Sequence, residues 1–319
     1  MWRYDAGSPV RSTPVLTPHG RVVFGTDKGA LVALETTGKD AWHFQAAGPI
    51  LARVAVATRL VGSAVHYSPR SASLTLVYCA AADGTLYALR EQDGKKVWTV
   101  TTQGPFSAPP LSVAGLVVAG NEAGEVLALQ GGNGRLVWEQ KVIGPVRAGA
   151  TAADGKVYVP SAAGVVSAFA LANGKKVWTT QLPGPLDSEA VVAGSGHLLI
   201  ASRAGYFYAL RRSDGQVTWA DRIDDPLEGA PAPGGQYLAL AGDSGRVWVY
   251  KHGGSWRIDA PVDVAAPLFP SVSALAQSSS EAPGRKRQED TSPTPALSAG
   301  LSELPVTSDL GESPAHPPA

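Results

Sequence analysis

The stretch that decides the fold is ALREQDGKKVW, residues 88–98, which returns in altered form as ALQGGNGRLVW at residues 128–138. Both copies begin with alanine, place a turn glycine at the seventh position and end with tryptophan. The tryptophan recurs at intervals of 40, 56, 40, 40, 41 and 37 residues, at Trp2, Trp42, Trp98, Trp138, Trp178, Trp219 and Trp256. A period near 40 residues indicates a propeller or a solenoid, in which each unit buries its apolar faces against its neighbours.

Two further landmarks accompany the tryptophan. A glycine flanked by turn-forming residues precedes an apolar strand at Gly29, Gly84, Gly124, Gly164, Gly205 and Gly245. Glycine adopts the positive φ of a tight hairpin at no steric cost. A proline follows the tryptophan by seven residues at Pro9, Pro49, Pro105, Pro145, Pro185 and Pro226, and Pro261 comes two residues early. Because proline has no N–H for a sheet ladder, it marks the connection between two sheets.

Four short strands per 40 residues, without helical periodicity, predict an all-β propeller of four-stranded antiparallel blades. We expect six complete blades, at residues 8–47, 48–103, 104–143, 144–183, 184–224 and 225–260. A partial seventh would combine an outer strand at Trp2 with an inner strand at Val262–Leu268. The alternative is a six-bladed ring with loose ends. Exposed strand edges in an incomplete blade predict possible self-association.

The sequence divides into a propeller at residues 1–268 and a tail at 269–319 that is rich in Pro, Ser, Ala and Glu, for which we predict disorder. The second unit is longer by about 16 residues, and we expect the excess to form a surface loop at Thr58–Ser73. Its candidate partner-binding residues are His66, Tyr67 and Arg70.

Composition excludes some classes of function and leaves the compartment open. The 27 basic and 27 acidic residues balance, so the chain lacks the basic footprint of a nucleic-acid-binding protein. Cys79 is the only cysteine, in an apolar context that predicts a buried thiol. The sequence contains no run of about 20 apolar residues, so it predicts no transmembrane segment. We expect a cytoplasmic protein if Met1 is the true start, and a periplasmic or extracytoplasmic one if an upstream signal is missing. The second case is considered because Trp2 is already in phase with the tryptophan repeat.

The two quoted stretches resemble the tryptophan-docking motif of the pyrroloquinoline-quinone-type (PQQ-like) repeat family, and the resemblance covers residues 1 to about 268. It implies a β-propeller, either a quinone-dependent dehydrogenase or a binding scaffold such as the outer-membrane assembly lipoprotein of Gram-negative bacteria. This chain departs from the family pattern at the Asp two positions after the alanine, which predicts weaker hydrogen bonding in that turn. The residues found there are Glu35, Arg90, Gln130, Ala170 and Arg211.

The dehydrogenase branch of the family is expected to show adjacent cysteines, calcium-binding acids and often a CxxCH haem segment. A single cysteine excludes the cysteine features, and no GxSxG, HExxH or P-loop motif is present. We therefore expect a non-enzymatic chain and assign no catalytic, cofactor-binding or metal-binding residue. The tryptophans are assigned to docking between blades.

One charged pattern is not required by blade packing. Two positions past the prolines stand Arg11, Arg147, Asp187, Glu228 and Asp263, and two positions further on stand Arg53 and Glu189. These positions begin the innermost strands, so they predict a channel mouth that is positive on one arc and negative on the other. Mutual neutralisation of the charges by ion pairs is the alternative.

The sequence favours a non-enzymatic scaffold that presents the channel mouth and the Thr58–Ser73 loop to a protein or peptide partner. Two alternatives stay open: a redox protein similar to the quinone-dependent dehydrogenases, and an accessory or sensor propeller cut from a larger enzyme. A quinone spectrum of the purified protein would identify the redox protein. The reading frame upstream of Met1 would identify an accessory propeller of a larger enzyme.

Overall fold

The computed structural model describes residues 1–61, 72–194, 196–235 and 237–251. All of them fall within one compact unit, Met1–Ser280. The predicted boundary at residue 268, the tail, Trp256 and Asp263 lie outside the described residues. No helix long and apolar enough to cross a membrane occurs in the described part of the chain.

Every regular element of the described part is a β-strand, and the strands form six antiparallel sheets in chain order. Sheet one contains β1 (Val15–Leu16), β2 (Val22–Gly25), β3 (Ala30–Leu34) and β4 (Asp40–Gln45). Sheet two contains β5 (Ala55–Val61), β6 (Ala72–Ala80), β7 (Thr85–Arg90) and β8 (Lys96–Thr101). Sheet three contains β9 (Leu111–Val113), β10 (Leu116–Gly120), β11 (Glu125–Gln130) and β12 (Leu136–Lys141). Sheet four contains β13 (Thr151–Ala153), β14 (Lys156–Pro160), β15 (Val165–Ala170) and β16 (Lys176–Gln181). Sheet five contains β17 (Val191–Ala193), β18 (His197–Ser202), β19 (Tyr206–Arg211) and β20 (Val217–Arg222). Sheet six contains β21 (Ala232–Gly234), β22 (Tyr237–Ala241) and β23 (Val247–Lys251).

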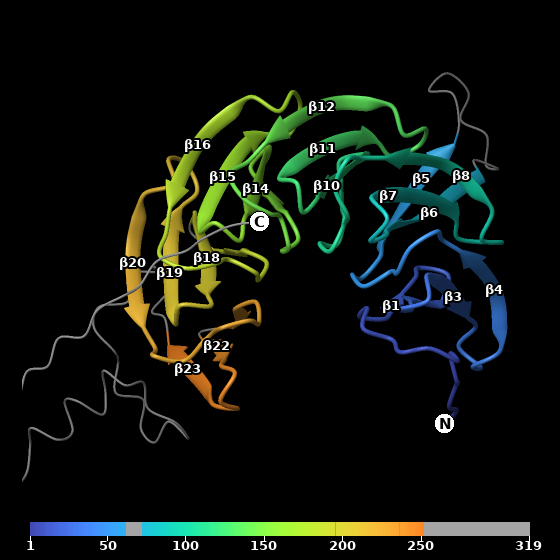
Figure 1. Ribbon diagram of the computed structural model, residues 1–319, viewed down its shortest axis with the longest axis horizontal. Helices are drawn as coiled ribbons and strands as arrows, with labels where there is room; N and C mark the ends of the chain where they lie inside the picture. Colours follow the sequence, from blue (N-terminus) through green and yellow to red (C-terminus); the bar gives the residue numbers. More distant parts are fainter. Residues whose placement is uncertain (62–71, 195, 236, 252–319) are drawn as a thin grey trace, which may run out of the picture. The chain divides into compact units, whose positions relative to one another are not determined.

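The sheets confirm the predicted all-β propeller architecture. Five have four strands, and the three strands of sheet six are those that the structure describes. Within each sheet the strands pair in sequence order. The sheets follow an arc on which β4, β12, β16 and β20 lie outermost (Figure 1). First strands of neighbouring sheets contact one another, β5 with β9 and β13 with β17, so they line the inside of the arc.

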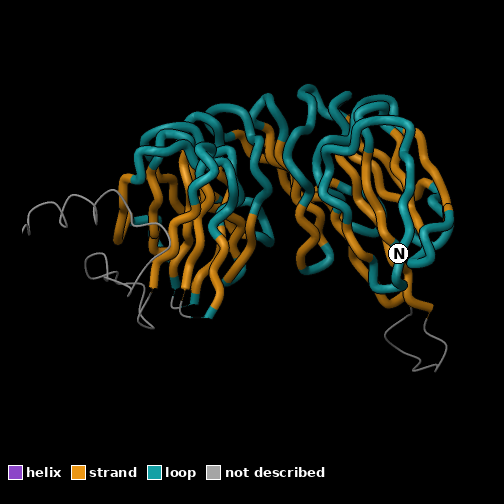
Figure 2. The backbone as a smooth tube through the Cα atoms, turned by 90° about the horizontal axis from the view of Figure 1, so that it is seen from below, coloured by secondary structure: helices purple, strands orange, loops and turns teal. Residues whose placement is uncertain are grey.

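Antiparallel order gives every sheet two ends, visible as loops above and below the strands in Figure 2. The connection that brings the chain in from the preceding sheet and the hairpin between the second and third strands share one end. We call this the proline end, because it carries Pro49, Pro105, Pro145, Pro185 and Pro226. The hairpins between first and second strands, and between third and fourth strands, lie at the opposite end.

The core lies between successive sheets. Leu31 and Ala33 of β3 pack with Val77 of β6 and Leu89 of β7 in a buried cluster that joins sheets one and two. Equivalent clusters join each later pair of neighbours. The third strand therefore needs apolar residues on both faces, which explains the uninterrupted apolar runs after each hairpin glycine.

Each described repeat tryptophan on an outer strand of the first four sheets bonds to the next sheet. Its indole Nε1–H donates to a backbone carbonyl of that sheet: Trp42 to Glu91, Trp98 to Gly131, Trp138 to Leu171 and Trp178 to Arg212, at 2.7 to 3.0 Å. Its ring covers the turn glycine of the same sheet, respectively Gly94, Gly134, Gly174 and Gly215. The repeat spacing thus sets how neighbouring sheets dock.

The chain start follows this docking rule without forming the expected strand. Residues 1–14 contain no strand, yet Trp2 donates to the carbonyl of Thr36 at 2.7 Å and covers Gly38. Tyr4 and Ala6 pack on the face of sheet one that no other described sheet covers. The start of the chain therefore caps sheet one.

The far face of sheet six is exposed among the described residues. Val247 and Val249 are 40% and 46% exposed, whereas the equivalent residues of the other five sheets are at most 1% exposed. Those buried equivalents are Leu31, Ala33, Leu86, Ala88, Val126, Ala128, Val166, Ala168, Phe207 and Ala209. This face marks the side on which a further blade is expected from the sequence.

One expectation from the sequence needs correction. The excess of unit two is not all loop: β5 runs through Val61 and β6 starts at Ala72, because Thr58 pairs with Thr75 in register and their hydroxyls lie 3.0 Å apart. The turn before the tryptophan keeps a side-chain hydrogen bond. The residue before its glycine supplies the acceptor to the amide two positions on, at Asp93, Asn133, Asn173 and Asp214.

Candidate functional site

The proline end is built on a repeated pair of backbone hydrogen bonds. The amide two positions before each hairpin glycine donates to the proline carbonyl of its own unit at 2.8 to 3.0 Å, as Glu122 does to Pro105. After Pro49, Pro105, Pro145, Pro185 and Pro226 the next residue is buried and its amide donates to the preceding sheet, as Ile50 does to Thr26 at 3.1 Å. Connections and hairpins are therefore held together as one surface.

Alternating burial along the connection between sheets then decides which side chains are free. The first and third positions after Pro185, Leu186 and Ser188, are buried, so the second and fourth positions, Asp187 and Glu189, point away from the core. Arg11, Arg147 and Glu228 stand at the second position after Pro9, Pro145 and Pro226 and are likewise exposed. All six described charged candidates form ion pairs at this end.

These charges are paired rather than isolated. Arg11 Nε lies 2.9 Å from Asp27 Oδ2, and Arg147 Nε lies 3.1 Å from Glu122 Oε2. Arg203 bridges two acids, with Nη1 3.5 Å from Asp187 and Nη2 on Glu228. The pairing that the sequence offered as an alternative is thus present in the structure.

Pairing leaves some of the acidic capacity unused. Asp187 Oδ1 is buried and has no hydrogen-bond partner among the described residues, and Asp243 forms no ion pair with them. Arg203 serves both Asp187 and Glu228, so sheets five and six carry more acid than base at this end. An opposite-charged group brought by a partner would find acceptors there.

The pair of Arg53 and Glu189 differs from the others because it joins distant sheets. Arg53 precedes β5 of sheet two, and Glu189 precedes β17 of sheet five. Arg53 Nη2 lies 2.6 and 2.7 Å from the two carboxylate oxygens. The pair crosses the inside of the arc, where the sequence predicted the channel mouth.

Sequence reasoning missed three partners, Asp27, Glu122 and Arg203. All three occupy the position two before a hairpin glycine, where Ala82, Ala162 and Asp243 stand in the remaining units. Reading that position in phase with the proline positions would have found them.

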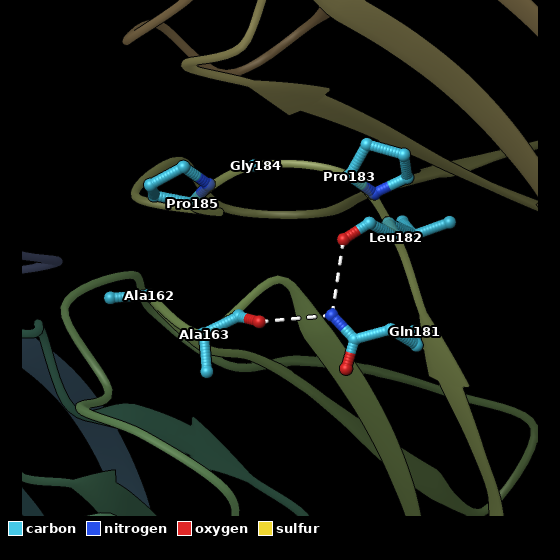
Figure 3. A pocket seen from close by; sticks show the side chains of 7 residues that line it. All are labelled: Ala162, Ala163, Gln181, Leu182, Pro183, Gly184 and Pro185. Atoms are coloured by element: carbon cyan, nitrogen blue, oxygen red, sulfur yellow. Dashed lines mark hydrogen bonds between the residues drawn. The ribbon is translucent and has the colours of Figure 1, made fainter.

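An uncharged depression lies beside Asp187 at the proline end. Ala162, Ala163, Leu182 and Pro183 to Pro185 line it together with Gln181, around a volume of about 570 Å³. Gln181 Nε2 donates to the carbonyls of Ala163 and Leu182 at 3.0 and 3.2 Å (Figure 3). Because no titratable group lines it, the depression suits an apolar side chain of a partner rather than acid–base chemistry.

The strand ends that flank the insertion of unit two lie away from this site. His66, Tyr67 and Arg70 lie outside the described residues, but β5 and β6 carry the chain to and from them at the opposite end of sheet two. The end of β5 and the start of β6 therefore do not share an end of the fold with the channel mouth.

Within the described ranges, no three side chains of His, Cys, Asp and Glu gather as a metal site would require. Cys79 is buried in the core between sheets one and two. Burial, with a smaller contribution from the charge of Asp83, raises the pKa of its thiol to about 12. The donor set that the quinone-dependent branch would need is not supplied by these residues.

Comparison with known proteins gives a family and a fold. The sequence model of the outer membrane protein assembly factor BamB matches residues 1–78, 82–185 and 162–255. The crystal structure of BamB from Moraxella catarrhalis is similar at 24% identity and a TM-score of 0.66, over 80% of this chain and 77% of that one. The computationally designed protein Ika8 is similar at 14% identity and a TM-score of 0.63, over 76% of this chain and 70% of that one. No curated protein matches the sequence.

Proposed function

The chain belongs to the family of the outer membrane protein assembly factor BamB, and from this premise we propose that it is a non-enzymatic scaffold whose proline end binds a protein partner. Family membership supports a binding role at a coarse level. The surface that carries the role is proposed from the geometry of this chain.

The observation that carries the proposal is the combination of charge and apolar surface at the proline end. Asp187, with its unpartnered buried oxygen, and Arg203 lie beside the uncharged depression of Pro183 and Pro185. Ile143, 68% exposed, adds an apolar side chain at the same end. An apolar depression flanked by charges is the usual composition of a protein-binding surface.

The proposal is narrower than the one the sequence suggested. The strand ends that flank the insertion of unit two lie at the opposite end of sheet two. A partner bound at the proline end is therefore not expected to contact the insertion as well. We assign the partner to the proline end and leave the insertion out of the binding surface.

Substitution at the two ends tests the assignment. Purified wild-type protein and the double variant Asp187→Asn, Glu228→Gln would be used to capture partners from extracts of the source cells, with identification by mass spectrometry and reconstitution from purified components. The variant is expected to weaken binding of the reconstituted partner by at least about tenfold, the cost of roughly one charge-assisted contact.

Asp154→Asn provides the matched control. Asp154 pairs with Arg212 Nη1 at 2.9 Å, but at the opposite end of its sheet. It should leave binding unchanged. Equal binding by all three proteins, or loss with Asp154→Asn alone, would contradict the assignment.

A further inference from the structure

A cavity lies between sheets one and two, at the end of the fold opposite the proline end. Its volume is about 270 Å³, and its lining comes from the β1–β2 hairpin, the start of β6 and the turn that follows β7. The polar residues that line it are His19, Arg21, Thr75, Arg90, Glu91 and Gln92. Of the described residues in this lining, Glu91 alone is acidic, beside two arginines and a histidine.

The extension of unit two supplies one wall of this cavity. In sheets three to five, the amide that follows the third strand donates to the carbonyl of a hairpin glycine of the same sheet, Gly115, Gly155 or Gly196. In sheet two, the equivalent amide of Glu91 donates to Thr75 at 2.9 Å, and β6 extends beyond Thr75 as far as Ala72. Leu74 and Thr75 of this extended strand line the cavity.

Glu91 is a buried carboxylate that the repeat does not require. Its side chain is 3% exposed, and the equivalent residues of sheets three, four and five are Gly131, Leu171 and Arg212. All four residues offer their backbone carbonyl to a tryptophan, so the docking of sheets uses no side chain at this position. Burial of a charge is costly unless the charge is paired. The role of this acid therefore lies in the groups that it holds.

Glu91 holds a histidine and an arginine at the cavity. Its Oε2 accepts from His19 Nδ1 at 3.1 Å and from Arg21 Nη1 at 3.3 Å, and its Oε1 accepts from Thr17 Oγ1 at 2.8 Å. Neighbours thus engage both carboxylate oxygens. The bond to Nδ1 leaves Nε2 of His19 for a ligand. Nε2 donates a hydrogen bond when the ring is protonated, and it accepts one from a hydroxyl group when the ring is neutral.

The two arginines are positioned by acids that stand outside the lining. Arg21 Nε donates to Glu35 Oε1 at 3.0 Å, and Arg90 Nε lies 3.0 Å from Asp93 Oδ1. Side chains that are already held lose less conformational freedom when a ligand binds. These arginines differ from those of the proline end because they line one cavity together with His19. Guanidinium groups that face a common space are a frequent donor set for a phosphoryl group.

We propose that this cavity binds the phosphoryl group of a small phosphate monoester. His19 and Arg21 reach the cavity from sheet one and Arg90 from sheet two, and donors on two sides suit the tetrahedral phosphoryl oxygens better than a planar carboxylate. The cavity has room for more than the phosphoryl group, so the ligand that we assign is an ester. This site lies at the opposite end from the protein-binding surface and does not depend on it.

Isothermal titration calorimetry of the full chain tests the proposal with glycerol 2-phosphate and with inorganic phosphate, and sodium chloride at the same ionic strength is the blank. Glycerol 2-phosphate is expected to bind at one molecule per chain, at least as tightly as inorganic phosphate. Arg90→Gln should weaken its binding about tenfold, because a charge-assisted hydrogen bond is lost. His19→Gln should weaken its binding by about fivefold or more, the cost of one hydrogen bond.

Arg211→Gln is the matched control. Arg211 stands at the position of Arg90 in sheet five, is similarly exposed and pairs with Asp214 at 2.8 Å, but it does not line the cavity. It should bind glycerol 2-phosphate as the wild type does. Thermal unfolding of each variant without ligand checks that the fold is retained.

Two results would overturn the proposed site: no heat beyond the blank with either phosphate compound, or weakening by Arg211→Gln as large as that by Arg90→Gln. Tighter binding of inorganic phosphate than of glycerol 2-phosphate would overturn the assignment of an ester and identify free phosphate as the ligand. Loss of the protein partner in the Asp187→Asn, Glu228→Gln variant is expected to leave phosphate binding unchanged, so the two proposals fail separately.

Discussion

Trp42 of sheet one donates its indole N–H to the carbonyl of Glu91 in sheet two, 2.7 Å away and 49 residues further along the chain. Trp138 makes the same bond to Leu171 over 33 residues, so the extra residues of unit two leave the joint unchanged. The carboxylate of Glu91 is itself buried and accepts from Thr17 Oγ1 at 2.8 Å. The joint between sheets one and two thus combines the repeated indole contact with a polar contact of its own.

Removal of a docked indole should cost stability in proportion to its burial. Trp138→Ala is expected to lower the free energy of unfolding by about 3–5 kcal/mol, since a buried ring and a hydrogen bond are lost. Trp2→Ala should cost less than about half of that, because Trp2 is 43% exposed. Urea unfolding followed by circular dichroism measures both. Equal losses of unfolding free energy in the two variants would show that the position of the tryptophan in the array, and not its burial, sets the loss.

Alanine substitutions at two glycines with nearly the same backbone conformation would distinguish the cost of displacing a docked indole from the cost of backbone strain. Gly174 and Gly155 have φ of +70° and +68°, but only Gly174 lies under the Trp138 ring, while a Cβ on Gly155 would meet nothing within 4 Å. Gly155→Ala should cost about 1–2 kcal/mol of unfolding free energy, the strain of a left-handed alanine. Gly174→Ala should cost clearly more, by about 1–3 kcal/mol, because its methyl group displaces the indole. Similar melting temperatures for the two variants would argue against ring docking at Gly174.

The reaction rate of the buried Cys79 thiol should report on separation of sheets one and two. With the pKa of Cys79 raised to about 12 by burial, the folded protein at pH 8 holds roughly a thousandfold less thiolate than a thiol of ordinary pKa 9.0. The folded protein should therefore react with a disulfide reagent at least about 100-fold more slowly than the protein in concentrated urea. Reaction of the native protein at the unfolded rate would mean that this interface is open.

Alkaline pH should destabilise the fold partly through Tyr208. Burial, and then the charge of Tyr206, raises the pKa of the Tyr208 phenol to about 12 from an ordinary value of 10.0. The folded state holds this proton more tightly, so the contribution is fully present below pH 10 and is lost as the pH rises towards 12. Its hydroxyl has no partner in the described residues, so Tyr208→Phe should be near neutral at pH 7. Unfolding free energies at pH 7 and pH 11 should differ less in Tyr208→Phe than in the wild type; an unchanged difference would contradict this origin.

The fold could be predicted from the sequence because one period carries it. Tryptophan, turn glycine and proline each occupy one place in the repeat, and the structure puts Trp138, Gly174 and Pro145 at those places in the expected roles of strand, turn and connection. Landmarks tied to backbone geometry recur in every unit and are therefore visible in a single sequence.

The site could be predicted only in part, because its partners do not recur. Arg147 and Asp187 were found as charges at a repeated position, but Glu122 and Arg203 come from a hairpin position that holds alanine in two other units. The contact of Arg53 with Glu189 spans 136 residues and depends on the curvature of the array, which no local pattern encodes. Self-association through the incomplete end stays a prediction that sedimentation velocity can check.

Site-specific photocrosslinking from one position at the proline end and one position at the opposite end tests the binding surface most directly. A photoreactive residue would replace Ile143, in the connection before sheet four at the proline end, or Ala172, in the β15–β16 turn at the opposite end. Both positions are exposed. Our account predicts that the reconstituted partner crosslinks to the protein labelled at Ile143 and not to the protein labelled at Ala172. Crosslinking from Ala172 without crosslinking from Ile143 would contradict it.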